Sequence, residues 1–110
     1  MTRHPGTGSV EEVLAALADP TRRQLLDRLA AHTSATATQL AGELPVSRQA
    51  VVKHLAVLDQ AGLVTGHRDG RERRYQVRPD ALADTARWLD HLAARWAKRL
   101  DAIKRIAESG

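Results

Sequence analysis

The first part of the chain carries hydrophobic residues at helical spacing, interrupted by polar residues that suit helix N-termini. Ser9, with Glu12 three residues later, has the pattern of a capping box before a first apolar stripe. Asp19 followed by Pro20 supplies a cap and an N1 proline for a second stripe, which ends near His32. We therefore predict two helices within residues 9–32.

A second pair of helices follows, with a shorter connection. Residues 33–35 read as a loop, after which Thr36 and Gln39 repeat the capping-box pattern ahead of a short helix over 37–44. Ser47 is a further N-cap, and its helix should run over 48–61. Because a three-residue turn joins these helices, residues 36–61 are predicted to form a helix-turn-helix.

A β-hairpin is predicted over residues 62–78. Two strand-like runs flank Asp69-Gly70, a strong signal for a two-residue turn. Tyr75 and Val77, of equal parity near the base, can pack on the body. Four arginines crowd the tip: Arg68, Arg71, Arg73 and Arg74. A hairpin that is apolar at its base and cationic at its tip is a wing.

A single long helix is predicted over residues 79–107. Apolar residues recur there every seven positions, at Leu82, Leu89, Trp96 and Ile103. Others widen the stripe: Ala86, Trp88, Leu92, Ala93, Leu100 and Ile106. This face exceeds what a terminal helix on a small domain needs, so we expect it to meet a partner.

The predicted fold is mainly α with a small β-hairpin wing, a winged helix-turn-helix of about five helices and two strands. At 110 residues the chain has room for one core, so residues 9–110 should form a single domain behind a flexible segment at 1–8.

The helix opened by Ser47 has one face for the core and one for a partner. Val51, Leu55 and Leu58 should face the core. The opposite face then carries Arg48, Gln49, Val52, Lys53 and Ala56. A helix in the major groove of DNA uses its N-terminal residues on base edges, which favours this face as a reading surface.

Each polar residue on that helix suits a particular DNA group. Arg48 can pair with guanine, Gln49 with adenine, and Val52 suits a thymine methyl. Lys53 can hold a phosphate, and Ser47 can divide its hydroxyl between capping and a backbone contact. His54 lies beside this face, and a phosphate contact and a packing role both remain open. The alternative for the whole set is ordinary exposed polarity.

Charge supports a polyanionic partner. The net charge is +4, and residues 44–78 hold seven Lys or Arg against three Asp or Glu. Such a local excess is typical of nucleic-acid binding, although solvated surface charge is the alternative. In the wing we expect Arg68, Arg71 and Arg73 to contact phosphate or the minor groove, whereas Arg74 has the opposite parity to the last two and is less suited.

Other function classes find little support in the sequence. There is no Cys, which removes disulfides, thiolate metal sites and thiol redox chemistry. No apolar run approaches the ~18 residues of a membrane span, so we expect a soluble, cytoplasmic protein without a membrane partner. No catalytic set converges: Ser47 and His54 should lie about 10 Å apart along one helix, and no P-loop or dinucleotide pattern is present. We expect neither enzymatic activity nor a cofactor.

Three segments together resemble the ArsR family of winged-helix repressors: residues 16–23, 46–55 and 61–64. The resemblance implies a homodimer built from the first and last helices, bound to a palindromic promoter site, usually as a repressor and often of its own operon. The residues that it implies at the dimer interface are Leu14, Leu17, Trp88, Leu92, Trp96 and Leu100.

The effector is where the chain departs from the family's metal sensors. These bind metal through Cys near the third helix or through His and Asp clusters in the last, and here only Asp84 and His91 share a face of the last helix. The chain therefore resembles the non-metal-sensing subset, and its effector stays open. Two alternatives remain: a metal-responsive repressor with His and Asp ligands, and a winged-helix protein-interaction module without specific DNA binding. RNA binding is disfavoured, because A-form RNA hides its major groove.

Overall fold

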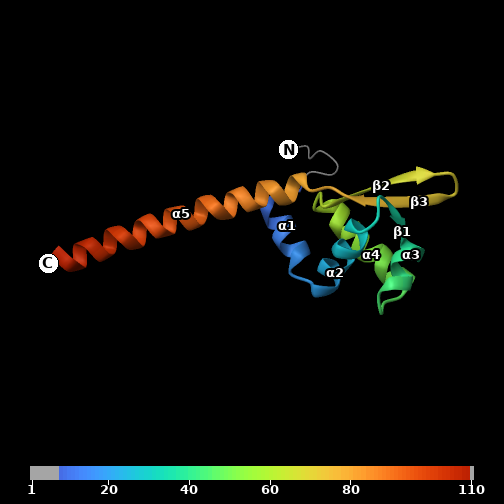
Figure 1. The fold of residues 1–110 in the computed structure, drawn as a ribbon, viewed down its shortest axis with the longest axis horizontal. Coiled ribbons are helices and arrows are strands. Elements are labelled where there is room, and N and C mark those ends of the chain that lie inside the picture. Colours follow the sequence, from blue (N-terminus) through green and yellow to red (C-terminus); the bar gives the residue numbers. More distant parts are fainter. Residues whose placement is uncertain (1–7, 110) are drawn as a thin grey trace.

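The computed structural model describes residues 8–109 and has eight elements in these residues (Figure 1). In chain order they are α1 Val10–Leu17, α2 Pro20–Ala30, β1 Ala35–Thr36, α3 Ala37–Glu43, α4 Arg48–Gln60, β2 Val64–Asp69, β3 Glu72–Val77 and α5 Asp80–Ser109. The winged helix-turn-helix prediction is confirmed. The segment predicted to be flexible, 1–8, lies outside the described residues except for Gly8.

The predicted caps account for where the helices begin. Ser9 and Glu12 form a reciprocal capping box in which each backbone N–H donates to the other side chain at 3.2 Å. Thr36 and Gln39 do the same at the start of α3. The backbone N–H of Ala50 donates to the Ser47 hydroxyl at 3.1 Å, which fixes the first turn of α4. These local signals were readable because a cap and its partner are only three residues apart.

The sheet has three strands, where the sequence predicted two. The order is β1-β3-β2, all antiparallel, and β1 occupies part of the segment expected to be a loop. Ala35 pairs with Tyr75 and Thr36 with Arg74, so β1 ties the start of the helix-turn-helix to the wing. A two-residue strand shows no alternation, and its pairing depends on a segment forty residues away.

The turn of the hairpin lies one residue further along the chain than predicted. Asp69 pairs with Glu72, so the two loop residues are Gly70 and Arg71 instead of Asp69 and Gly70. Gly70 has φ +64°, and no residue other than glycine has a positive φ in the described part of the chain. A positive φ at only the first central residue fits a type II′ turn.

The core lies where α1, α2, α3 and α4 meet the base of the sheet. Its largest fully buried side chains are Leu25, Leu29, Leu40, Leu55, Leu58, Leu63, Val13, Val51 and Val64. Tyr75 and Val77 pack against this core, as predicted. Helix α5 begins beside α1 and then leaves the body, giving the molecule extents of 70 × 34 × 22 Å (Figure 1). None of the helices described is both long and apolar enough to cross a membrane.

Candidate nucleic-acid interface

Helix α4 has the two faces that its sequence predicts. Val51, Leu55 and Leu58 are fully buried, and they fix the rotation of the helix about its axis. The opposite side is exposed and carries Arg48, Gln49, Val52, Lys53 and Ala56. The exposed row therefore follows from the burial of three apolar side chains.

Arg48 is held at one edge of this row. Its Nε donates to the Thr38 hydroxyl of α3 at 3.1 Å, which leaves the terminal nitrogens free of that bond. Arg48 and Val52 also line a hollow of about 630 Å³ between the helix-turn-helix and the wing. Its other lining residues are Thr36, Ala37, Thr38, Gln39, Arg71, Glu72, Arg73 and Tyr75.

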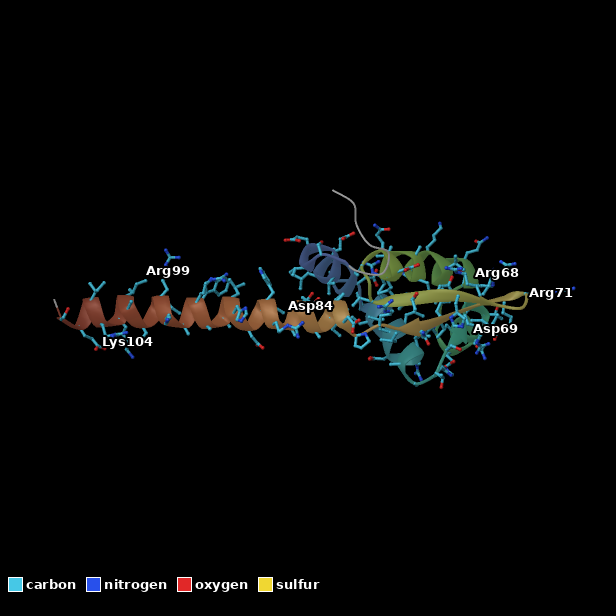
Figure 2. All side chains as sticks on the ribbon, turned by 90° about the horizontal axis from the view of Figure 1, so that it is seen from above. Arg68, Asp69, Arg71, Asp84, Arg99 and Lys104 are labelled. Atoms are coloured by element: carbon cyan, nitrogen blue, oxygen red, sulfur yellow. The ribbon has the colours of Figure 1, made fainter. Side chains whose placement is uncertain are left out.

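The wing directs two arginines to the same side as this hollow. Arg68 and Arg73 are directly paired across β2 and β3, two positions beyond the pair formed by Gly66 and Tyr75. Because side chains alternate along a strand, these two pairs project from one face of the hairpin. Arg71 lies in the loop, and Figure 2 shows it with Arg68 at the far end of the hairpin. Arg71 and Arg73 thus line the hollow together with Arg48 and Val52 of α4, and Arg68 shares a face of the hairpin with Arg73.

Arg74 lies on the opposite face of the hairpin and is engaged within the chain. Its Nε donates to the Ser34 hydroxyl at 2.8 Å and one terminal nitrogen to the Ser34 carbonyl at 3.0 Å. It also forms an ion pair with Glu72 at 3.0 Å. Arg74 therefore fastens the wing to the segment before β1, so it does not belong with the other arginines at the tip.

His54 lies on the flank of α4 that faces the start of α2. It is half-buried, and its proximity helps to lower the pKa of Asp19. Desolvation alone would raise that pKa, but backbone N–H groups of Arg22 and Thr21 donate to the carboxylate and, with the Arg22 charge, hold the pKa below its ordinary value. The two roles predicted for His54, a phosphate contact and packing, both stay predictions.

Arg22 and Arg23 have a structural role that sequence reasoning missed. Arg22 donates to the carbonyls of Ala16 at 2.7 Å and Ala15 at 3.1 Å, and Arg23 donates to the carbonyl of Leu17. They therefore cap the C-terminal end of α1, whose carbonyls lack helical partners. The signal for this role in the sequence was a pair of basic residues that begins two positions after the proline at N1 of α2.

The residues expected at a dimer interface occupy different environments. Leu17 packs against the core, and Leu14 on α1 is partly exposed. On α5 only Ala81 and Thr85 are buried, Leu92 is half-buried, and exposure rises along the helix from 39% at Trp88 to 60% at Trp96 and 67% at Leu100. The chain itself leaves most of this apolar stripe uncovered.

No metal centre is evident in residues 8–109, where no group of three or more His, Cys, Asp or Glu side chains could hold an ion. Asp84 forms an ion pair with Arg87 on the same helix. His91 instead lines a shallow hollow with Ala94, Arg95 and Lys98.

The arrangement of α3, α4 and hairpin defines a winged helix-turn-helix DNA-binding protein. A helix-turn-helix domain model matches residues 17–67. The chain is 40% identical over 101 residues to the HTH-type transcriptional regulator Rv2034 of Mycobacterium tuberculosis, covering 92% of this chain and 91% of the relative. It is 46% identical to an ArsR-like transcriptional regulator from Rhodococcus sp. RHA1, with a TM-score of 0.87 and 92% of both chains covered. The chain belongs to the ArsR family of transcriptional regulators.

Two further similarities bear on assembly and effector. The chain is 38% identical over 109 residues to the probable mercury resistance operon repressor of Streptomyces lividans, covering 97% of this chain and 83% of the relative. It is 27% identical to a homodimeric winged helix-turn-helix DNA-binding domain from Mycobacterium bovis, with a TM-score of 0.60 and 81% and 79% of the two chains covered.

Proposed function

We propose that this transcriptional regulator binds a palindromic promoter site as a homodimer and represses transcription there. The promoter of its own operon is the first target to test. The observation that carries the proposal is the common side shared by the exposed row of α4 and the wing arginines. Arg48 and Val52 of α4 line one hollow with Arg71 and Arg73 of the wing. A major-groove helix flanked by a cationic hairpin can read bases and hold phosphates together.

Within this proposal the residues divide into readers and anchors. Arg48 and Gln49 are exposed in the first turn of α4, where long donors reach base edges. Lys53, Arg68 and Arg71 are exposed cations suited to phosphates, and the Ser47 hydroxyl is engaged as the N-cap. Val52 is 39% exposed, which leaves its methyl groups available to a thymine.

The homodimer rests on the uncovered stripe of α5. Trp96, Leu100 and Ile106 are 60%, 67% and 71% exposed, and a continuous apolar row of this size favours a partner surface. The homodimeric relative from Mycobacterium bovis supports a second copy as that partner. Two-fold symmetry would then set two α4 helices about 34 Å apart, one turn of the duplex, on a palindrome.

We propose that DNA binding does not require a metal. The described residues bring no group of three ligands together, and the sequence contains no Cys. The relative named for mercury resistance makes a metal-responsive repressor the second candidate. In that case Asp84 and His91 of two copies would together form the metal site.

The test is selection of bound fragments from genomic DNA by the full chain, with and without Hg²⁺ and Zn²⁺. A shared palindromic sequence recovered without metal would support the proposal. Recovery of fragments with no common sequence would contradict specific reading and favour a protein-interaction module. Release of a palindromic fragment by either ion would favour the metal-responsive alternative.

A further inference from the structure

Glycine in the middle of a strand weakens it, yet Gly66 lies within β2. The structure shows what occupies the space that a side chain would take. A Cβ added at Gly66 would lie 2.9 Å from both Nε and Nη2 of Arg73 and 3.1 Å from its Cζ. The guanidinium of Arg73 therefore lies against the bare backbone of the neighbouring strand.

The ring of Tyr75 lies near the same guanidinium. The Cζ atom of Arg73 lies 5.7 Å from the centre of the Tyr75 ring, within the range of a cation–π interaction. Tyr75 is itself fixed, because it packs against the core and pairs with Gly66 on one side and Ala35 on the other. A rigid ring and an open backbone thus form a cradle for Arg73, which we name the Gly66–Tyr75 cradle.

Arg71 provides the contrast within the same wing. It lies in the two-residue loop, is exposed, and makes no hydrogen bond or ion pair with the part of the chain that the structure describes. Both arginines line the hollow beside α4. Arg73 is exposed as well, but unlike Arg71 its guanidinium lies against the Tyr75 ring and the backbone of Gly66.

We infer that Gly66 and Tyr75 are positioning residues that make Arg73 a specificity-determining contact. This inference rests on the proposed binding of DNA by the wing. An arginine held in one place loses less conformational freedom on binding and meets only DNA whose groove or backbone lies at the matching distance. Arg73 then adds to discrimination between sequences, and Arg71, which has no such neighbours, adds mainly to affinity for any duplex.

The test is a mutant cycle of Gly66→Ala and Arg73→Ala in the full chain. The three atoms nearest to an added Cβ all belong to the Arg73 guanidinium and none to the backbone, so Gly66→Ala should displace Arg73 while the fold is kept. Gly42→Ala is the matched control, since a Cβ at Gly42 meets nothing within 4 Å. The probes are the strongest genomic fragment selected by the wild-type chain and a random duplex of equal length. Thermal unfolding checks each variant's fold.

The expected result is loss of discrimination that depends on Arg73. Gly66→Ala should lower the ratio of selected to random binding by roughly threefold or more, typical of coupled neighbours, and should change nothing further in the Arg73→Ala background. Tyr75→Phe should retain the ratio, whereas Tyr75→Leu should lower it. The Gly42→Ala chain should bind as the wild type does.

Three results would overturn the inference, and they can be told apart. Equal losses from Gly66→Ala in both backgrounds, or a Gly66→Ala ratio equal to that of Gly42→Ala, would refute the cradle while Arg73→Ala still weakened binding and the proposed function stood. Unchanged binding by Arg73→Ala itself would refute the cradle and the proposed DNA contact of Arg73, while the proposed roles of α4, Arg68 and Arg71 would stand.

Discussion

The two ends of this molecule differ in how far other parts of the chain contact and cover their side chains. At the wing and α4, three of the charged side chains have neighbours within the chain that hold them: Thr38 for Arg48, Ser34 for Arg74, and the cradle for Arg73. Along the far part of α5, large apolar groups have no cover, and Ile106 is 71% exposed. Figure 2 shows these ends well apart, with Arg71 at one and Lys104 near the other.

The contrast shows which end is complete in a single chain. A polar surface arranged before binding fits a partner of fixed shape, and a duplex of DNA is such a partner. An apolar stripe in water is stabilised only when another apolar surface covers it. The proposed reading surface is therefore formed by one chain, whereas the proposed dimer interface on α5 would be complete only with a second copy, and the following variants test the two separately.

The largest effect should come from Trp96→Asp. A charge in the middle of the apolar stripe should give monomers in sedimentation and remove the roughly 10³-fold or greater margin of specific over non-specific DNA binding. Ala94→Asp is the control, because Ala94 lies on the polar side of α5 beside Arg95 and Lys98. A wild-type chain that sediments as a monomer and still binds its site specifically would contradict the dimer.

Arg48→Ala should have the next largest effect and should act on sequence preference. We expect a loss of about 1–3 kcal/mol for each half-site of the selected fragment and relaxed preference at one base pair in each half, measured by anisotropy with single-base variants of the fragment. Arg28→Ala removes the same charge from an exposed position on α2 and should bind normally. Wild-type affinity and preference for the Arg48 variant would show that the reading face is assigned wrongly.

Arg71→Ala should weaken binding to all duplexes by a similar factor. A cation at the loop of the wing contributes through phosphate, so the magnitude of the slope of log K against log salt should fall by about one for each of the two copies in the proposed dimer. Titrations at four salt concentrations, on selected and random duplexes, measure this slope. A loss confined to the selected fragment would instead make Arg71 a reader of sequence.

The smallest effect is expected for Asp19, in the body between the two ends, and concerns the pH dependence of thermal stability. The folded state lowers the pKa of Asp19, so its stabilising contribution is present above the unfolded value of about 4 and is lost as pH falls through the lower folded pKa. Asp19→Asn keeps an acceptor for the cap but does not titrate. Its thermal stability should therefore fall less steeply below pH 4, and parallel curves for both chains would refute this role.

Local and distant interactions explain how much of this could be predicted. The caps at Ser9 and Ser47 and the buried face of α4 depend on residues a few positions apart, and all were predicted. The strand β1, the partner of Arg74 and the space beside Gly66 depend on contacts between segments far apart or on opposite strands. The spacing of apolar residues along the sequence does not indicate such contacts. The same holds for the side chains that fix Arg48 and Arg73.

The uncovered stripe on α5 also sets how the proposed repressor would respond to its own abundance. While dimers are scarce, their number rises with the square of the number of chains, because two must meet before either reading surface is paired. Occupancy of the operator then rises more steeply than in proportion to the concentration of the chain. Dilution of the chain by cell growth would therefore relieve the proposed repression more sharply than in proportion to the concentration of the chain.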